Sequence, residues 1–175
     1  MKVAILCGGY GTRIRDVADD LPKPMIPIGG YPIIWHIMKY YASFGHDEFI
    51  LCLGYKSNVI KDYFLNYEAR TTDFSITLGK KDSIEILNNH TEQNWKITFA
   101  ETGLDSMTGT RIKKIQKYIN PGESFMLTYG DGLSNINIDK LISYHNSHGK
   151  SLTLSGVKPA GRFGEIMSNS KGAIT

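Results

Sequence analysis

The chain has 175 residues, of which 41% are hydrophobic, 21% charged and 11% aromatic, and its net charge is +3. This composition is typical of a folded globular protein and excludes a disordered chain. The small, scattered basic excess argues against a nucleic-acid-binding protein. No apolar run is long enough to span a membrane, and Arg13 and Arg15 cut the first one too short for a signal peptide, so we expect a cytoplasmic protein.

The first half of the chain alternates predicted strands and helices. Apolar strands are predicted over 2–9 and 48–55, and helices over 31–45 and 57–70, with Ser57 as the N-cap of the second helix. Three β-rich segments follow, over 74–79, 84–89 and 95–102. Each of the two apolar strands holds one cysteine, Cys7 or Cys52, which we expect to be a buried, reduced thiol.

The second half continues the alternation. A helix with a basic outer face is predicted over 108–119, a buried strand over 124–132, a helix over 137–149 and a strand over 151–160. Solidly apolar strands that alternate with helices predict an α/β fold, a Rossmann-like and mostly parallel sheet with helices on both faces. No repeat or linker-like stretch interrupts the pattern, so we expect one domain over 1–175.

Ligands of such sheets bind at the carboxyl ends of the strands. Three features fall there: the loop after Leu6, the turn over 129–132 and the segment after Val157. Their shared location makes this edge the expected functional site.

The loop after Leu6 is rich in glycine. Gly8, Gly9 and Gly11 let successive N–H groups turn toward one anion, and Thr12 and Arg13 follow at once. The P-loop pattern is missing from the chain, and Ile14 stands where the dinucleotide fingerprint needs a third glycine. Both the P-loop class and a nicotinamide dehydrogenase are therefore disfavoured.

Two cations near this loop suit phosphate. Arg13 offers a planar fork of donors, and Lys23 offers a point charge between Pro22 and Pro24, which fix the backbone on either side. The alternative is a glycine-rich turn with solvated surface cations, and the combination of the two motifs disfavours it.

The strings GGYGTRI and LPKPMIPIGGYPIIWHIM resemble the signature of the sugar-1-phosphate nucleotidyltransferases, and the similarity runs along essentially all of the chain. The strings DSMTGTRIKKI, FMLTYGDG and GRFG are most similar to the branch that uses CTP and α-D-glucose 1-phosphate. The resemblance implies the nucleotidyltransferase fold, formation of CDP-glucose and pyrophosphate with Mg²⁺, and a homo-oligomer, with no nucleic-acid or membrane partner.

The resemblance also implies roles for individual residues. Arg13, Lys23 and Asp131 become the expected catalytic residues, with Asp131 holding the metal. The expected nucleotide-binding residues are Leu6, Gly8, Gly9, Tyr10, Gly11, Thr12, Arg13, Lys23, Thr108, Arg111 and Gly130. Considered alone, Asp131 is better interpreted as a turn residue, because Asp-Gly is common in turns, but its position beside the glycine-rich loop favours the metal ligand.

Arg111 is the expected reader of the base. Cytosine presents acceptors at O2 and N3 where uracil and thymine present an N3–H donor, so an arginine fork attracts cytosine and repels the others. The alternative is a basic surface helix, because Lys113, Lys114 and Lys117 are neighbours.

Members of the resembling family are longer than this chain. They carry a second acidic metal ligand and a lysine in a Glu-Lys-Pro motif beyond its last residue, so the domain is expected to be C-terminally truncated. Two alternatives stay open: the same chemistry with UTP, dTTP or another hexose 1-phosphate, and a non-catalytic nucleotide-binding module. His145 and His148 are set aside as a metal site because nothing completes the ligand set.

Overall fold

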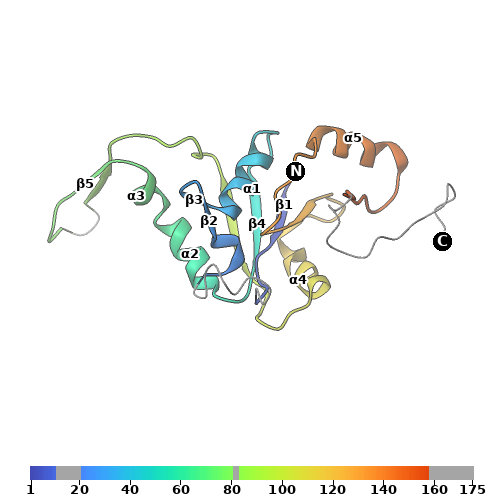
Figure 1. The fold of residues 1–175 in the computed structure, drawn as a ribbon, viewed down its shortest axis with the longest axis horizontal. Coiled ribbons are helices and arrows are strands. Elements are labelled where there is room, and N and C mark those ends of the chain that lie inside the picture. Colours follow the sequence, from blue (N-terminus) through green and yellow to red (C-terminus); the bar gives the residue numbers. More distant parts are fainter. Residues whose placement is uncertain (11–20, 81–82, 158–175) are drawn as a thin grey trace. The chain divides into compact units, whose positions relative to one another are not determined.

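The computed structural model describes residues 1–10, 21–80 and 83–157 (Figure 1). The chain divides into two compact units, Met1–Asn135 and Ile136–Thr175, which are described separately. The single domain expected over 1–175 stays a prediction. No helix among the described residues is long and apolar enough to cross a membrane.

The first unit is built on a four-stranded sheet in the order β7-β4-β1-β8. Its strands are β1 (Val3–Leu6), β4 (Glu48–Leu53), β7 (Lys96–Glu101) and β8 (Met126–Tyr129). All three neighbouring pairs are parallel. The expected parallel sheet is confirmed.

One face of this sheet packs under α4 (Thr108–Ile115) and the 3-10 helix η2 (Gln116–Tyr118). Alternate strand residues point to the same face, so Ala4, Ile50 and Ala100 share this side with the fully buried Ile115 of α4.

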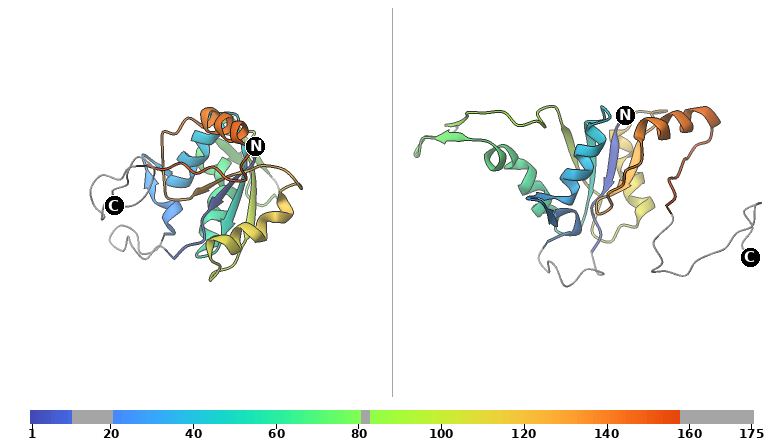
Figure 2. Two further views of the ribbon diagram at one scale, coloured as in Figure 1. Left: turned by 90° about the vertical axis from the view of Figure 1, so that its right-hand side faces the viewer. Right: turned by 45° about the horizontal axis from the view of Figure 1, so that its top comes forward.

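The other face is covered by α1 (Ile33–Ala42) and α2 (Ser57–Leu65). Phe49 packs edge-on against Trp95, which contacts Trp35 of α1. Phe64 of α2 packs against Phe99 of β7 with ring centroids 6.0 Å apart. Helices therefore lie on both faces, as predicted, and Figures 1 and 2 show α1 and α4 on opposite sides of the strands.

The predicted helix over 57–70 is divided in two. Its second part is α3 (Tyr67–Thr71), and Asn66 separates it from α2. The Asp62 carbonyl accepts from the backbone N–H of Asn66 at 3.2 Å and also from its side-chain amide at 2.8 Å, so Asn66 satisfies the end of α2 twice.

The prediction that Ser57 caps α2 is wrong. Lys56 occupies the N-cap position with φ of 48°, no side-chain cap bond is made, and Ser57 is the first helical residue. The Ser57 hydroxyl instead bonds to Glu101. The pKa of Glu101 is lowered mainly by the hydrogen bond from Lys61 and to a smaller extent by the one from Ser57. The serine therefore ties α2 to the end of β7.

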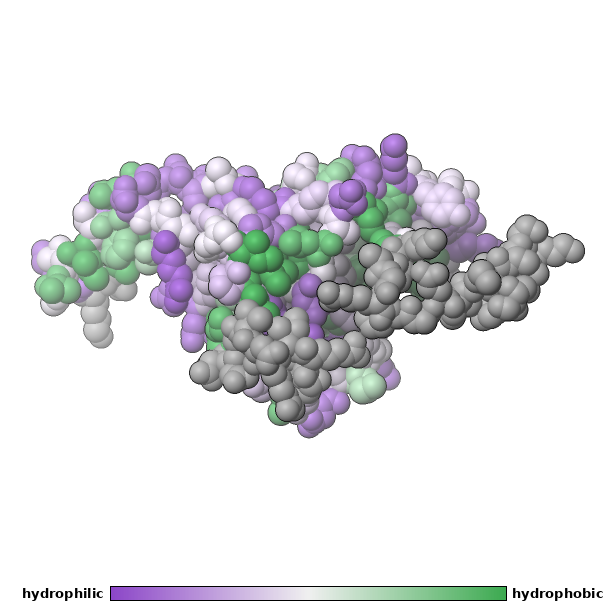
Figure 3. Space-filling view, viewed as in Figure 1, coloured by the Kyte–Doolittle hydropathy of each residue, from purple (hydrophilic) through white to green (hydrophobic). Residues whose placement is uncertain are grey.

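Two short hairpins complete the first unit. β2 (Pro27–Ile28) pairs with β3 (Tyr31–Pro32), and β5 (Phe74–Ile76) pairs with β6 (Ile84–Ile86), both antiparallel. Figure 3 shows apolar side chains gathered over the second hairpin, where Leu78 is 87% exposed.

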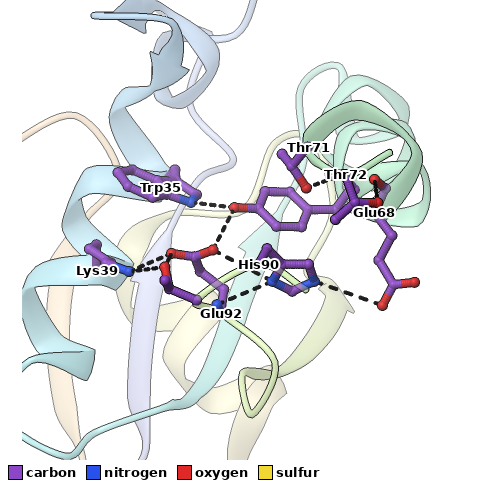
Figure 4. A network of polar contacts seen from close by, with 9 residues as sticks. Trp35, Lys39, Glu68, Thr71, Thr72, His90 and Glu92 are labelled. Carbon is purple, nitrogen blue, oxygen red and sulfur yellow. Dashed lines mark hydrogen bonds and ion pairs between the residues drawn. The ribbon is translucent and has the colours of Figure 1, made fainter. Parts of the chain in front are cut away.

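A polar network joins α1, α3 and the segment before β7 (Figure 4). Glu92, which is 7% exposed, accepts hydrogen bonds from Lys39, Thr91 and Tyr67. The indole of Trp35 in turn donates to the Tyr67 hydroxyl at 2.7 Å. Burial pushes the pKa of Glu92 up, but these donors hold the pKa below its ordinary value.

Two strand predictions were wrong in part. In β8, Met126 is buried but Leu127 and Tyr129 are exposed, because β8 is the edge of the described sheet. In the second unit, residues 151–157 form no strand, and no described strand pairs with them.

The second unit contains α5 (Ile138–His148). The Asn137 side chain caps its N-terminus by accepting from the N–H of Lys140 at 2.9 Å, and Gly149 ends it with φ of 64°. His145 and His148 each lie 2.8 Å from the hydroxyl of Thr153.

Candidate nucleotide-binding site

The carboxyl ends of β1 and β8 lie side by side. Leu6 is opposite Tyr129 in the parallel register, and the N–H of Gly130 donates to the Leu6 carbonyl at 3.0 Å. The loop after Leu6 and the turn over 129–132 therefore meet, as the sequence predicts. The third expected feature, after Val157, lies outside the described residues.

The 3-10 helix η1 (Lys23–Met25) positions Lys23 at this edge. Pro22 precedes it in an extended conformation with φ of −65°, and Pro24 is buried. Pro24 packs against Gly130, where a Cβ atom would lie 2.9 Å from its Cγ atom. Gly130 thus allows the close approach that brings Lys23 to the end of β8.

Lys23 and Asp131 form the central pair of the site. Lys23 Nζ lies 3.5 Å from Asp131 Oδ2, and their side chains are 22% and 40% exposed. A pair this exposed contributes little to stability. Both groups are accessible, so a cation and a carboxylate stand together where phosphate and a metal ion are expected.

A cavity of about 260 Å³ opens beside this pair. It joins the carboxyl ends of β1 and β8 to the start of α4, and it is lined by Leu6, Cys7, Gly8, Gly9, Lys23, Pro24, Ser106, Met107, Thr108, Arg111, Tyr129 and Asp131. Nine of the expected site residues are described, and all of them except Tyr10 and Gly130 line this cavity.

Three expected site residues, Gly11, Thr12 and Arg13, lie outside the described residues. Tyr10 is exposed, and its hydroxyl donates to Asp105 at 2.8 Å, which raises the pKa of the phenol. Burial raises the pKa of the Cys7 thiol well above its ordinary value, so Cys7 is a packing residue of the cavity wall, as expected.

Arg111 is buried, with 6% of its surface exposed. Its Nη1 atom donates to Leu53 O at 3.0 Å, to Gly103 O at 2.8 Å and to Thr102 Oγ1 at 2.7 Å. Its Nη2 atom donates to Gly8 O at 3.0 Å and to Leu104 O at 3.1 Å. No carboxylate among the described residues pairs with it.

This arrangement bears on the predicted role of Arg111. Both terminal nitrogens are engaged by protein oxygens, so the fork is not free for a base in the arrangement seen here. Direct reading of cytosine stays a prediction, and it requires the guanidinium to exchange carbonyl partners for the base.

Two residues that hold this cluster, Thr102 and Lys114, have no signal in the sequence. Thr102 is fully buried, and its hydroxyl donates to Leu53 O at 2.6 Å. Lys114, expected on a basic surface helix, donates to the Thr102 carbonyl at 2.7 Å and to the Ser106 hydroxyl at 3.0 Å. Both donate to backbone carbonyls, which no residue pattern reveals.

The residues at the strand ends fit Mg²⁺. Magnesium takes one or two protein carboxylates and completes its shell with water and phosphate oxygens. Asp131 offers one accessible carboxylate beside Lys23. Among the described residues there is no cluster of three or more His, Cys, Asp or Glu that could hold a metal ion.

Comparisons with known proteins identify the family of the chain. The family model described as "Nucleotidyl transferase" matches residues 2–175. The solved structure of HddC from Yersinia pseudotuberculosis complexed with GMP-PN superposes with a TM-score of 0.68 at 29% identity, covering 99% of this chain and 67% of that one. The chain therefore belongs to the nucleotidyl transferase family.

Two curated relatives are more similar in sequence. A "Probable glucose-1-phosphate cytidylyltransferase" from Bacillus subtilis (strain 168) is 49% identical over 167 residues. A "Glucose-1-phosphate cytidylyltransferase" from Salmonella typhimurium is 43% identical over 166 residues. In both comparisons the match covers 95% of this chain but only 64% of the relative's length. The chain is thus similar to the larger part of a cytidylyltransferase.

Proposed function

We propose that this chain carries the nucleotide-binding part of a glucose-1-phosphate cytidylyltransferase. The reaction joins the cytidylyl group of CTP to α-D-glucose 1-phosphate and releases pyrophosphate. The identity of 43–49% to two such enzymes supports the substrate pair. The match to the nucleotidyl transferase family supports nucleotidyl transfer as the reaction.

The observation that carries the proposal is the placement of Lys23. Packing of Pro24 on Gly130 fixes the lysine beside Asp131 at the carboxyl ends of β1 and β8. A charge held in advance costs little entropy when a phosphate binds. A solvated surface lysine lacks this support.

The chemistry asks mainly for position and positive charge. A phosphate oxygen of the sugar attacks the α-phosphorus of CTP, and the bond from that phosphorus to the pyrophosphate oxygen breaks. Lys23 donates to phosphate oxygens and offsets their charge, and Arg13 is proposed to do the same. Asp131 holds Mg²⁺, which when bound neutralises further phosphate charge.

A second candidate is a nucleotide-binding module that does not transfer. Such a module needs only a nucleotide-sized cavity beside Lys23 and Asp131, which the described residues form. The variant with UTP, dTTP or another hexose 1-phosphate also stays open, because the fork of Arg111 is engaged by carbonyls. Self-association stays a prediction that light scattering tests.

The test is a pyrophosphate-release assay on the purified chain with Mg²⁺ and glucose 1-phosphate. CTP, UTP, dTTP and GTP are compared, and reactions without the sugar phosphate serve as controls. The proposal expects release with CTP above the other three. Binding of CTP without release supports the module, and absence of both binding and release contradicts both candidates.

A further inference from the structure

The peptide bond between Gly8 and Gly9 has a fixed orientation. The Gly8 carbonyl accepts from Arg111 Nη2 at 3.0 Å and from the N–H of Tyr55 at 3.3 Å. Because a trans peptide is planar, the N–H of Gly9 points in the opposite direction to that carbonyl. The contact with Arg111 therefore also fixes where the Gly9 donor points.

The Gly9 N–H is left for a ligand. No described residue accepts a hydrogen bond from it, and Gly9 lines the cavity beside Lys23. A peptide donor in a binding cavity gains most from an acceptor oxygen of the ligand.

Arg111 is anchored independently of Gly8. Leu53, Gly103, Leu104 and Thr102 hold its guanidinium from β4 and from the segment after β7. A Cβ atom on Gly8 would lie 2.1 Å from Nη1, so only glycine allows this contact. The anchored side chain sets the position of the loop.

We propose that Arg111 is a positioning residue that holds the Gly8 carbonyl and thereby presents the Gly9 N–H to an oxygen of the bound nucleotide. This rests on the proposed function, since it takes a nucleotide as the ligand. It differs from base reading in its consequence: a positioning residue affects CTP and UTP equally, whereas a base reader changes their ratio.

The test uses Thr102→Val, Thr102→Ser and Arg111→Lys in the full chain. Thr102 does not line the cavity, and its hydroxyl orients Arg111 at 2.7 Å. Valine keeps the shape and removes the hydroxyl, and serine restores the hydroxyl. Lysine keeps the charge but cannot reach the same set of carbonyls. Circular dichroism checks the fold of each variant.

Titration calorimetry with CTP and with UTP gives the first result. Thr102→Val is expected to raise both Kd values by the same factor, about fivefold, as for loss of one hydrogen bond. Thr102→Ser is expected to bind like the wild type. Arg111→Lys is expected to raise both Kd values by more than about tenfold.

The backbone amide signal of Gly9 gives the second result. In a ¹⁵N-labelled chain CTP is expected to shift this signal strongly in the wild type and in Thr102→Ser, and weakly in Thr102→Val and Arg111→Lys. A merely structural role of Arg111 leaves the shift in Thr102→Val unchanged.

Each outcome decides the inference. Wild-type affinity in both Thr102→Val and Arg111→Lys overturns it, and so does an Arg111→Lys effect confined to CTP, which indicates base reading. If the wild type binds no nucleotide, the proposed function fails and takes this inference with it. If the wild type binds CTP and the variants bind equally well, only this inference fails.

Discussion

Two buried charges in the first unit are satisfied in opposite ways. Arg111, 6% exposed, is surrounded mainly by backbone carbonyls, and no described carboxylate pairs with it. Glu92, 7% exposed, is surrounded by side-chain donors from Lys39, Thr91 and Tyr67. The two differ in what they hold together.

Backbone partners make Arg111 a support for loops. Its acceptors belong to the last residue of β4 and to the segments after β1 and β7, so one side chain fixes three strand ends beside the cavity. The partners of Glu92 are side chains of α1 and α3, so Glu92 holds these two helices to the segment before β7. We expect loss of Arg111 to affect ligand binding and stability, and loss of Glu92 to affect stability alone.

The largest effect is expected for Arg111→Ala. It leaves several buried oxygens without their donor, and each buried hydrogen bond contributes about 1 kcal/mol. Urea unfolding is expected to show a loss of about 3 kcal/mol in the free energy of unfolding. A loss of unfolding free energy below about 1 kcal/mol means that water replaces the guanidinium as hydrogen-bond donor. Arg111 would then not be needed to hold the loops, in contradiction to the comparison with Glu92.

The next effect is expected for Gly8→Ala. The three atoms nearest to the new Cβ all belong to the Arg111 guanidinium, so we expect a loss of about 2 kcal/mol from overpacking. In an Arg111→Ala background the same change is expected to cost much less. Unfolding of the two single variants and the double variant measures this coupling.

Gly54→Ala is the matched control for that cycle. Its Cβ would meet the backbone oxygens of Gly8 and Gly103 at 2.8 and 3.0 Å as well as Arg111. Removal of Arg111 leaves those oxygens in place, so the cost of Gly54→Ala should persist. If Arg111→Ala reduces the destabilisation by Gly8→Ala and by Gly54→Ala equally, a specific contact between Gly8 and Arg111 is contradicted.

A smaller effect is expected for Glu92→Gln, about 1 kcal/mol at neutral pH. The folded state holds the pKa of Glu92 below its ordinary value of 4.5, so the carboxylate stabilises the fold above that pH. This stabilisation is lost as the pH falls through the lowered pKa of the folded state. Unfolding between pH 7 and 3 should therefore show the wild type and Glu92→Gln converging in acid.

The control for the acid series is Glu48→Gln. Glu48 forms an exposed pair with Lys96, with side chains 47% and 74% exposed. Such pairs contribute little, so this variant should follow the wild type throughout. If the free energy of unfolding of Glu92→Gln matches that of Glu48→Gln at every pH, the Glu92 carboxylate does not stabilise the fold.

Most of the fold could be predicted from local patterns. The apolar runs that became β1 and β4 and the helical spacing of α1 depend on residues next to one another in the chain. Ser57 and residues 151–157 were predicted wrongly because a turn at Lys56 and the absence of a described partner strand are matters of tertiary structure.

The site was predictable in its place and less so in its detail. Lys23 and Asp131 belong to motifs that follow two strands of the parallel sheet. The carboxyl ends of such strands meet at one edge, so the two residues were expected to lie close together, as they do. The carbonyl partners of Arg111 could not be predicted, because backbone acceptors leave no trace in the sequence, and the role of Thr102 depends on that same cluster.

Lys23 is the central residue of the proposed site, a fixed charge that binds phosphate. Calorimetric titration of CTP with Mg²⁺ into Lys23→Met and Lys113→Met tests it, because Lys113 is an exposed cation of α4 outside the cavity. Loss of one charge-assisted hydrogen bond predicts a rise in Kd of about tenfold or more for Lys23→Met, and none for Lys113→Met. Equal affinities in the two variants would contradict the account.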